Sequence, residues 1–204
     1  MMRSIIFQAA ALLLTYPDEQ LLERLDLIEE AVAQTRAAAD FAPTVAHLRS
    51  APIMELQSWH VQEFDLSRRH ALHLTYWTDG DTRRRGEVLP AIKQTYRDSG
   101  LLVDLGGELP DFLPMVLEFA AVGNPELGVG LLNRYRAALE LLRIGLAEDK
   151  LPQEGIIRAI CTELGGPSPR TRAEVQELLA GPLQETVGLD ATFLPYPQLQ
   201  GSSR

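Results

Sequence analysis

Apolar residues along this chain recur at intervals of three and four positions. Between Asp18 and Ala39 the leucines, isoleucine and valine repeat at this spacing, with Glu and Arg between them. That spacing places the apolar side chains on one face of a helix. No segment shows the strict alternation that is typical of a strand. The pattern therefore predicts an all-α protein, a single-domain helical bundle.

Cap residues, glycines and prolines indicate where the predicted helices begin and end. Ser4 and Asp18 are suited to cap the first two helices, and Pro52 is tolerated in a first helical turn. We expect Asp111 to cap a helix that begins near Phe112. After the first helix, the predicted helices cover residues 18–39, 44–49, 52–64, 67–78, 82–99, 112–122, 124–147, 152–164 and 171–180.

The C-terminal part of the chain differs from the rest in composition. Glycine and proline are concentrated in residues 165–169, which we expect to link two helices. Further prolines follow in residues 181–204, which end in Gly-Ser-Ser-Arg. We therefore predict one all-helical domain over residues 1–180 and a Pro-rich, mobile tail over residues 181–204.

Charge and cysteine content limit the class of partner and the compartment. The chain has 19 basic and 28 acidic residues, which gives a formal net charge of −9. This charge opposes non-specific binding to nucleic acid phosphates and favours a partner with local positive charge. Cys161 is the single cysteine, so no internal disulfide is expected. We expect a cytoplasmic protein that does not bind nucleic acid.

The apolar run from Ile5 to Leu14 imitates the core of a signal peptide. It is too short to span a bilayer, which needs about 20 residues, and Tyr16-Pro17-Asp18-Glu19 follows where a cleavage site would need small residues. A buried first helix is the better interpretation. Since no other segment is a candidate span, we expect no direct membrane insertion.

Candidate catalytic and metal-binding residues are few. His70 and His73 could lie on one helix face as metal ligands, but no cluster of carboxylates or cysteines completes a ligand shell. Asp79-Gly80-Asp81 resembles the start of a calcium loop, yet basic residues follow where oxygen ligands would be needed. No catalytic residue, metal site or cofactor is predicted, and the chain is not expected to be an enzyme.

Basic residues are concentrated in Arg83-Arg84-Arg85, with Arg68 and Arg69 upstream. Arginines beside Asp79 and Asp81 can pair with these carboxylates in a bidentate arrangement. We therefore interpret Asp79-Gly80-Asp81 as a helix break, and the arginines as a solvated face or as members of internal ion pairs.

Acidic and apolar residues occur together between Asp104 and Glu126, where five residues are acidic and none is basic. Phe112, Met115 and Phe119 follow one another at helical spacing. Exposed acidic and apolar side chains on one surface would form a groove for a positively charged amphipathic helix. The alternative is a core stripe with a solvated acidic edge, and the spacing alone does not distinguish the two.

Four segments, in order along the chain, resemble one known family. Leu14-Thr15-Tyr16-Pro17-Asp18 is similar to its opening turn, and Trp59 to Asp65 is similar to its aromatic element. The segment from Leu74 to Gly86 resembles its Tyr-x-x-Gly-(Asp/Glu)-x-Arg-x-Arg-Gly core, and Glu108 to Phe119 resembles its fourth motif. The chain thus resembles the NarJ-type chaperones, the delta subunit of respiratory nitrate reductase, within the redox-enzyme maturation group that includes TorD-like proteins. The resemblance covers Ile6 to Leu142.

This resemblance implies a cytoplasmic, all-helical assembly chaperone. The implied partner is the catalytic alpha subunit of respiratory nitrate reductase, whose N-terminal segment, a remnant of a twin-arginine signal, folds into an amphipathic helix. The chaperone would keep this subunit competent for molybdenum cofactor and iron–sulfur insertion before membrane attachment. The alternatives are a cofactor- or nucleotide-handling accessory enzyme and a dimerising helical scaffold. We expect a monomer or a weak homodimer.

The residues predicted to bind the peptide lie in the fourth motif and are Glu108, Asp111, Phe112, Met115, Glu118 and Phe119. The residues of the predicted structural signature lie in the third motif and are Tyr76, Asp79, Gly80, Asp81, Arg83, Arg85 and Gly86. The chain departs from the family pattern at Phe112, where members usually carry His. If that His tunes peptide binding through protonation, this chain lacks the switch.

Overall fold

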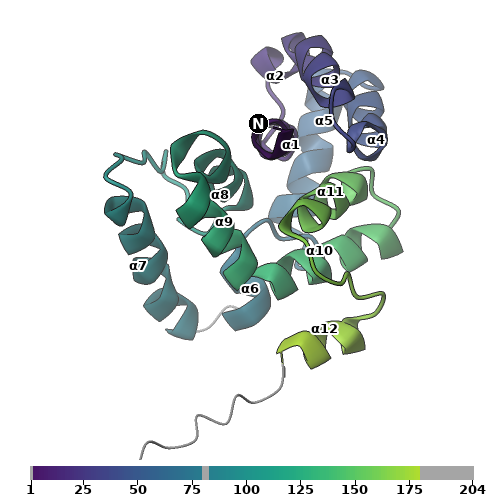
Figure 1. Ribbon diagram of the computed structural model, residues 1–204. Helices are drawn as coiled ribbons and strands as arrows, with labels where there is room; N and C mark the ends of the chain where they lie inside the picture. The colour runs from purple at the N-terminus through teal and green to yellow at the C-terminus, as the bar shows by residue number, and fades with distance from the viewer. Residues whose placement is uncertain (1, 80–82, 180–204) are drawn as a thin grey trace, which may run out of the picture.

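The computed structural model describes residues 2–79 and 83–179, which form helices and no strand (Figure 1). The predicted all-α fold class is therefore confirmed for this part of the chain. The predicted tail and the predicted domain boundary at residue 180 lie outside the described residues. The elements are α1 (Met2–Leu13), α2 (Glu19–Glu23), α3 (Leu25–Ala33), α4 (Ala38–Arg49), α5 (Ile53–His60), the π-helical turn η1 (Val61–Asp65), α6 (Leu74–Asp79), α7 (Arg83–Asp98), α8 (Leu113–Glu118), the π-helical turn η2 (Phe119–Gly123), α9 (Pro125–Arg134), α10 (Arg136–Glu148), α11 (Glu154–Leu164) and α12 (Arg172–Leu179).

Helix α1 lies in the middle of the bundle. It packs against α3 on one side and against α8, η2 and α11 on the others, and Figure 1 shows it between the α2–α5 group and α8. Ile6, Phe7 and Leu14 are fully buried there. A helix that is apolar on several faces is stable only when it is surrounded by other helices. The apolar run of the first segment is therefore part of the core, as predicted.

The first predicted boundaries need correction. Helix α1 already includes Met2, so Ser4 lies inside this helix and does not cap it. Asp18 does cap α2, because its Oδ1 accepts a hydrogen bond from the backbone N of Leu21 at 2.7 Å. The single helix predicted over residues 18–39 is divided at Arg24 and ends at Ala33.

A local side chain explains why α3 stops early. The hydroxyl of Thr35 donates to the carbonyl of Val32 at 2.7 Å and accepts from the backbone N of Ala37 at 3.2 Å. Threonine in this arrangement offers the backbone an alternative to the next helical turn. The chain consequently turns before α4 begins.

Two further predicted helices differ from the structure. The helix predicted over residues 67–78 exists only from Leu74 onward, and residues 67–73 are non-helical. The long helix predicted from residue 124 to 147 starts as expected, since the Asn124 side chain accepts from the backbone N of Leu127 at 3.0 Å. It is divided at Tyr135, after which α10 packs against α11 and α6.

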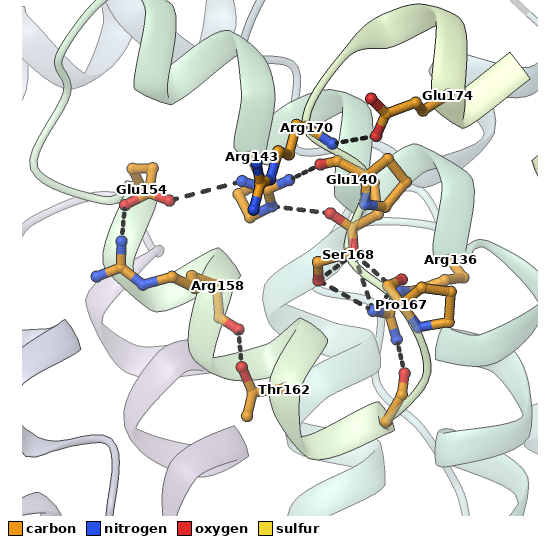
Figure 2. Close-up of polar contacts among 12 residues, drawn as sticks. Arg136, Glu140, Arg143, Glu154, Arg158, Thr162, Pro167, Ser168, Arg170 and Glu174 are labelled. Carbon is orange, nitrogen blue, oxygen red and sulfur yellow. Dashed lines mark hydrogen bonds and ion pairs between the residues drawn. The ribbon is translucent and has the colours of Figure 1, made fainter.

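The buried carboxylate of Glu140, on α10, fixes the segment that follows α11 (Figure 2). It accepts hydrogen bonds from Arg136 at 2.8 Å, Arg143 at 2.8 Å and Ser168 at 2.9 Å. Burial by itself raises the pKa of Glu140, but these hydrogen bonds outweigh burial and lower the pKa below its ordinary value. Residues 165–169 are non-helical, as predicted, and they are bonded to α10 by the same two arginines.

None of the helices within residues 2–79 and 83–179 has the length and apolarity that crossing a membrane requires.

Replacing Gly128 by Ala should destabilise the fold by about 1–3 kcal/mol, because overpacking strains a closely packed contact. A Cβ atom at this position would lie only 2.4 Å from the Cα of Ala120. Gly130 on the same helix is the matched control, since nothing lies within 4 Å of its Cβ position. Gly130→Ala should leave stability unchanged or raise it by up to about 1 kcal/mol. Urea unfolding measures both variants, and equal losses at the two positions would contradict the packing explanation.

Candidate functional site

Segments that are far apart in the sequence meet at a pocket of about 460 Å³. We call it the Asp111 pocket, after the buried residue beside it. Its walls come from the end of η1, the non-helical residues 66–73, α6, α7 and the residue before α8. The lining residues are Phe64, Asp65, Leu66, Ser67, Arg68, Ala71, Leu72, His73, Tyr76, Arg85 and Phe112. The pocket therefore joins residues of the second, third and fourth sequence motifs.

Asp111 is 0% exposed, and its carboxylate organises one wall of the pocket. Its Oδ2 accepts hydrogen bonds from the backbone N of Thr75 at 3.0 Å and from the Thr75 hydroxyl at 2.5 Å. The other oxygen, Oδ1, lies 3.3 Å from Nδ1 of His73. The Arg85 guanidinium reaches the same group, with Nε 3.0 Å from the Thr75 hydroxyl and Nη2 3.5 Å from Asp111 Oδ2. One carboxylate, two residues before α8, thus connects the chain there to α6, α7 and His73.

The pKa of Asp111 shows which effect dominates around this carboxylate. Burial raises the pKa, because a charged group loses its hydration. Hydrogen bonds from His73 and Thr75, together with the charge of His73, outweigh burial and lower the pKa of Asp111 below its ordinary value. The carboxylate is therefore ionised at neutral pH and remains available to its partners.

Backbone pairing joins the segment before α6 to the segment before α8. His73 and Phe112 form an isolated antiparallel bridge, in which Leu74 N donates to Asp111 O at 3.0 Å and Leu113 N donates to Leu72 O at 2.8 Å. The rings of His73 and Phe112 also pack together, with centroids 5.4 Å apart. This pairing helps to explain why residues 67–73 are non-helical although their sequence favours a helix.

His70 fastens the same non-helical segment to its neighbours. Its buried imidazole lies 3.2 Å from a Glu63 carboxylate oxygen through Nδ1 and 2.9 Å from Asp149 Oδ2 through Nε2. Gly145 allows the backbone at Arg69 to approach α10 closely, since a Cβ at position 145 would lie 2.8 Å from the carbonyl oxygen of Arg69. His70 and His73 therefore bond different carboxylates. No group of three or more potential metal-ligating residues is present in the described part of the chain.

A second concave surface shares no lining residue with the Asp111 pocket. Two pockets of about 390 and 410 Å³ adjoin at Val122, and we call them together the apolar trough. The first is lined by α1 and α3 and includes Leu27, and the second is lined by residues 101–104 and by the α8–η2 segment. Leu27 is 66% exposed and Val122 is 68% exposed. Large apolar side chains that remain exposed next to one another are typical of a binding surface.

Comparison with known proteins identifies the family. The family model described as "Nitrate reductase delta subunit" matches residues 24–147. The chain belongs to this family. A Bacillus subtilis protein named "Probable nitrate reductase molybdenum cofactor assembly chaperone NarJ" is 35% identical over 139 residues, which make up 65% of this chain and 73% of that protein.

Other relatives of the delta subunit family differ in length from this chain. The nitrate reductase-like protein NarX of Mycobacterium tuberculosis is 43% identical over 159 residues, or 77% of this chain, but the chain spans only 24% of NarX. The nitrate reductase molybdenum cofactor assembly chaperone NarJ of Escherichia coli K12 is 30% identical over 117 residues, 53% of this chain and 48% of that protein. A solved structure from Archaeoglobus fulgidus, described as that of a redox enzyme maturation protein, shares the fold, with a TM-score of 0.60, 23% identity and coverage of 80% of this chain and 94% of that one.

The residues of the predicted structural signature occupy different places in this delta subunit fold. Tyr76 and Arg85 line the Asp111 pocket, while Arg83 is exposed and lies 3.9 Å from Glu87. Gly86 is also exposed, on the other side of α7 near Pro110. Asp79 ends α6 and accepts a hydrogen bond from the Thr78 hydroxyl at 2.8 Å. Gly80 and Asp81 lie outside the described residues. Arg85 pairs with Asp111, at 3.5 Å. Asp81 lies outside the described residues, and the predicted pairing of the arginines with Asp79 and Asp81 stays a prediction.

The residues predicted to bind a peptide are divided between the two surfaces. Phe112 lines the Asp111 pocket, whereas Met115, Glu118 and Phe119 line the apolar trough. Glu108 lies exposed in the loop before α8. Asp111 is not the cap of α8, because Phe112 occupies the cap position without a side-chain hydrogen bond and Asp111 bonds Thr75 instead.

Sequence reasoning missed the contributions of His73 and Thr75. The spacing of His73 from His70 suggests only a metal ligand, and Thr75 lies in the third motif with no predicted role of its own. The feature of the sequence that points to this region is the departure from the family pattern at Phe112. Phe112 stands where the family usually has His, and the structure places the imidazole of His73 against Phe112 and next to Asp111.

Replacing Asp111 by Asn should lower the free energy of unfolding at neutral pH by about 1–3 kcal/mol, because Thr75, His73 and Arg85 lose a buried charged acceptor. The folded-state pKa of Asp111 is lowered, so its stabilisation is present above the unfolded pKa and is lost as pH falls through the folded pKa. Urea unfolding should be measured from neutral pH to below the ordinary Asp pKa of about 3.9. The difference in free energy of unfolding between the wild type and Asp111→Asn should become smaller as the pH falls.

Asp98→Asn serves as the control for this variant, since Asp98 is exposed on α7. It should change stability by less than about 0.5 kcal/mol at every pH. A constant deficit of Asp111→Asn over the whole pH range would contradict the role assigned to the ionised carboxylate.

Proposed function

We propose that this protein is a cytoplasmic assembly chaperone for respiratory nitrate reductase. In this proposal it binds the N-terminal segment of the catalytic alpha subunit. It then supports molybdenum cofactor and iron–sulfur insertion before the subunit attaches to the membrane. Membership of the delta subunit family supports the role, and so do the names of the NarJ relatives from Bacillus subtilis and Escherichia coli.

The observation that carries the proposal is the apolar trough. Leu102 is fully exposed beside it, and Leu27 and Val122 leave about two thirds of their surfaces open to solvent. Burying such side chains under a partner is favourable by roughly 25 cal/mol per Å² of apolar surface. An amphipathic helix can lay its apolar face along a surface of this kind.

Charge around the trough favours a cationic partner. Asp104 and Glu118 line it together with the apolar side chains, and no basic residue lines either of its two pockets. The protein as a whole carries a formal charge of −9. Lysine or arginine on the polar face of a docked helix would meet these carboxylates, which accelerates encounter and fixes orientation more than it adds affinity.

The proposal assigns separate tasks to the fourth-motif residues. Met115 and Glu118 contact the bound helix directly, and Phe119 forms the floor, held by an edge-to-face contact with Tyr96 at 4.8 Å between ring centroids. Glu108 adds negative charge in the exposed loop before α8. Asp111 does not contact the bound helix, because a fully buried carboxylate that already accepts hydrogen bonds does not meet the lysines or arginines of a partner.

Val122→Asp and Leu27→Asp should each weaken binding of a synthetic peptide from the first residues of the cognate catalytic subunit by about tenfold or more. The reason is that each change places a charge where the apolar face of the peptide would lie. Isothermal titration calorimetry measures the affinity. Glu118→Gln should reduce the salt dependence of binding with a smaller loss of affinity.

Met54→Asp is the matched control, since Met54 is 76% exposed on α5 and lies outside the trough. It should leave the affinity for the peptide unchanged. No heat with the wild-type protein, or the same loss in Met54→Asp as in Val122→Asp, would contradict docking in the trough.

A further inference from the structure

We propose that the Asp111 pocket is a second binding site, separate from the trough, for a small organic anion with a flat apolar body. The inference does not depend on the proposed chaperone function, because the two surfaces share no lining residue.

Hydrogen-bond donors predominate among the polar groups of the pocket. The Arg68 guanidinium and the Tyr76 hydroxyl both line it, and neither forms a hydrogen bond or ion pair within residues 2–79 and 83–179. Arg85 lines it as well, and it carries several N–H donors. Asp65 is the single carboxylate in the lining. A ligand that satisfies these groups must bring acceptor atoms, and a carboxylate or phosphate brings several.

Asp111 positions Arg85 and His73 for such a ligand. It is buried behind the wall, where it and Thr75 hold one edge of the Arg85 guanidinium in place. A guanidinium that is already fixed loses less conformational entropy when it binds an anion. The same carboxylate orients His73 through Nδ1, at 3.3 Å, so that the opposite edge of the ring points away from Asp111.

The remaining walls determine the shape of the ligand. Phe64, Tyr76 and Phe112 contribute aromatic rings, and Leu66 and Leu72 contribute aliphatic surface. The volume of about 460 Å³ lies within the range of roughly 300–1,000 Å³ that is usual for small-molecule sites. Rings and arginines together favour a planar anion, because the rings can stack on it while the guanidinium groups bind its charge.

A site for an anion is unusual on a protein with a negative net charge. At a formal charge of −9 the chain repels anions at long range, so any anion must be held by short-range contacts. Arg68 and Arg85 both line one pocket, whereas the trough has no basic lining residue. The protein therefore carries two surfaces of opposite preference, one for cations and one for anions.

Phenyl phosphate is the probe for this site, with inorganic phosphate and neutral benzyl alcohol as comparison compounds. Amide NMR titrations of the full chain should show saturable shifts with phenyl phosphate, centred on His73, Tyr76 and Phe112. Inorganic phosphate should bind more weakly and benzyl alcohol should not saturate. Arg68→Gln should weaken phenyl phosphate binding by about tenfold, the usual effect of losing one charge-assisted contact.

Arg97→Gln is the matched control, because Arg97 is exposed on α7 and lies outside the pocket. It should leave phenyl phosphate binding unchanged, and Val122→Asp should do the same. Arg68→Gln should in turn leave binding of the catalytic-subunit peptide unchanged.

Four results would overturn the inference. They are no saturation by phenyl phosphate at millimolar concentration, equal affinity for benzyl alcohol, an equal loss in Arg97→Gln, and displacement of phenyl phosphate by the catalytic-subunit peptide. The last result would assign the pocket to the peptide partner, while the trough variants would still test the proposed function on their own.

Discussion

The ionised carboxylate of Asp111 is buried in the interior, and much of the surrounding structure is arranged to keep it there. An unpaired buried charge is costly, so the fold must supply partners from several elements. Thr75 contributes its backbone N and its hydroxyl, and His73 and Arg85 contribute nitrogen atoms from two other places in the chain. Satisfying one charge thereby fixes the relative positions of α6, α7 and the start of α8.

The segment around α8 consequently contributes to two different surfaces. Phe112, just before α8, packs at a tilt against His73 and lines the Asp111 pocket. Within α8, Met115 and Glu118 line the trough that α1 and α3 complete. Because α8 also packs on the central helix α1, both surfaces are built on the most buried part of the molecule. Binding at either surface can therefore rely on a rigid support.

Buried polar groups recur wherever non-helical segments meet the bundle. Glu140 fastens residues 165–169 to α10, and His70 fastens residues 66–73 between Glu63 and Asp149. In each case charged partners satisfy groups that would otherwise be unpaired in the interior. The helices themselves pack through apolar side chains, so these polar contacts determine chiefly how the connections between helices are placed.

Features that depend on neighbouring residues could be predicted from the sequence. Helical spacing indicated the all-α class, and the cap at Asp18 was predicted correctly because a cap bonds a backbone N only three residues ahead. The start of a helix at residues 124–125 was predicted correctly as well. Residues of the second, third and fourth family motifs line one pocket. The motifs did not indicate that the predicted peptide-binding residues face two separate surfaces.

Features that depend on distant partners follow from the three-dimensional packing. Asp111 looked like a cap from its place before a helix, but it bonds Thr75, which lies 36 positions away in the sequence. The sequence of residues 67–73 favours a helix, yet the bridge to Phe112 and the bonds of His70 to Asp149 hold this segment in a non-helical conformation. Local propensities amount to a fraction of a kcal/mol per residue, whereas a buried charge without a partner costs several. Where the two conflict, the long-range contact prevails.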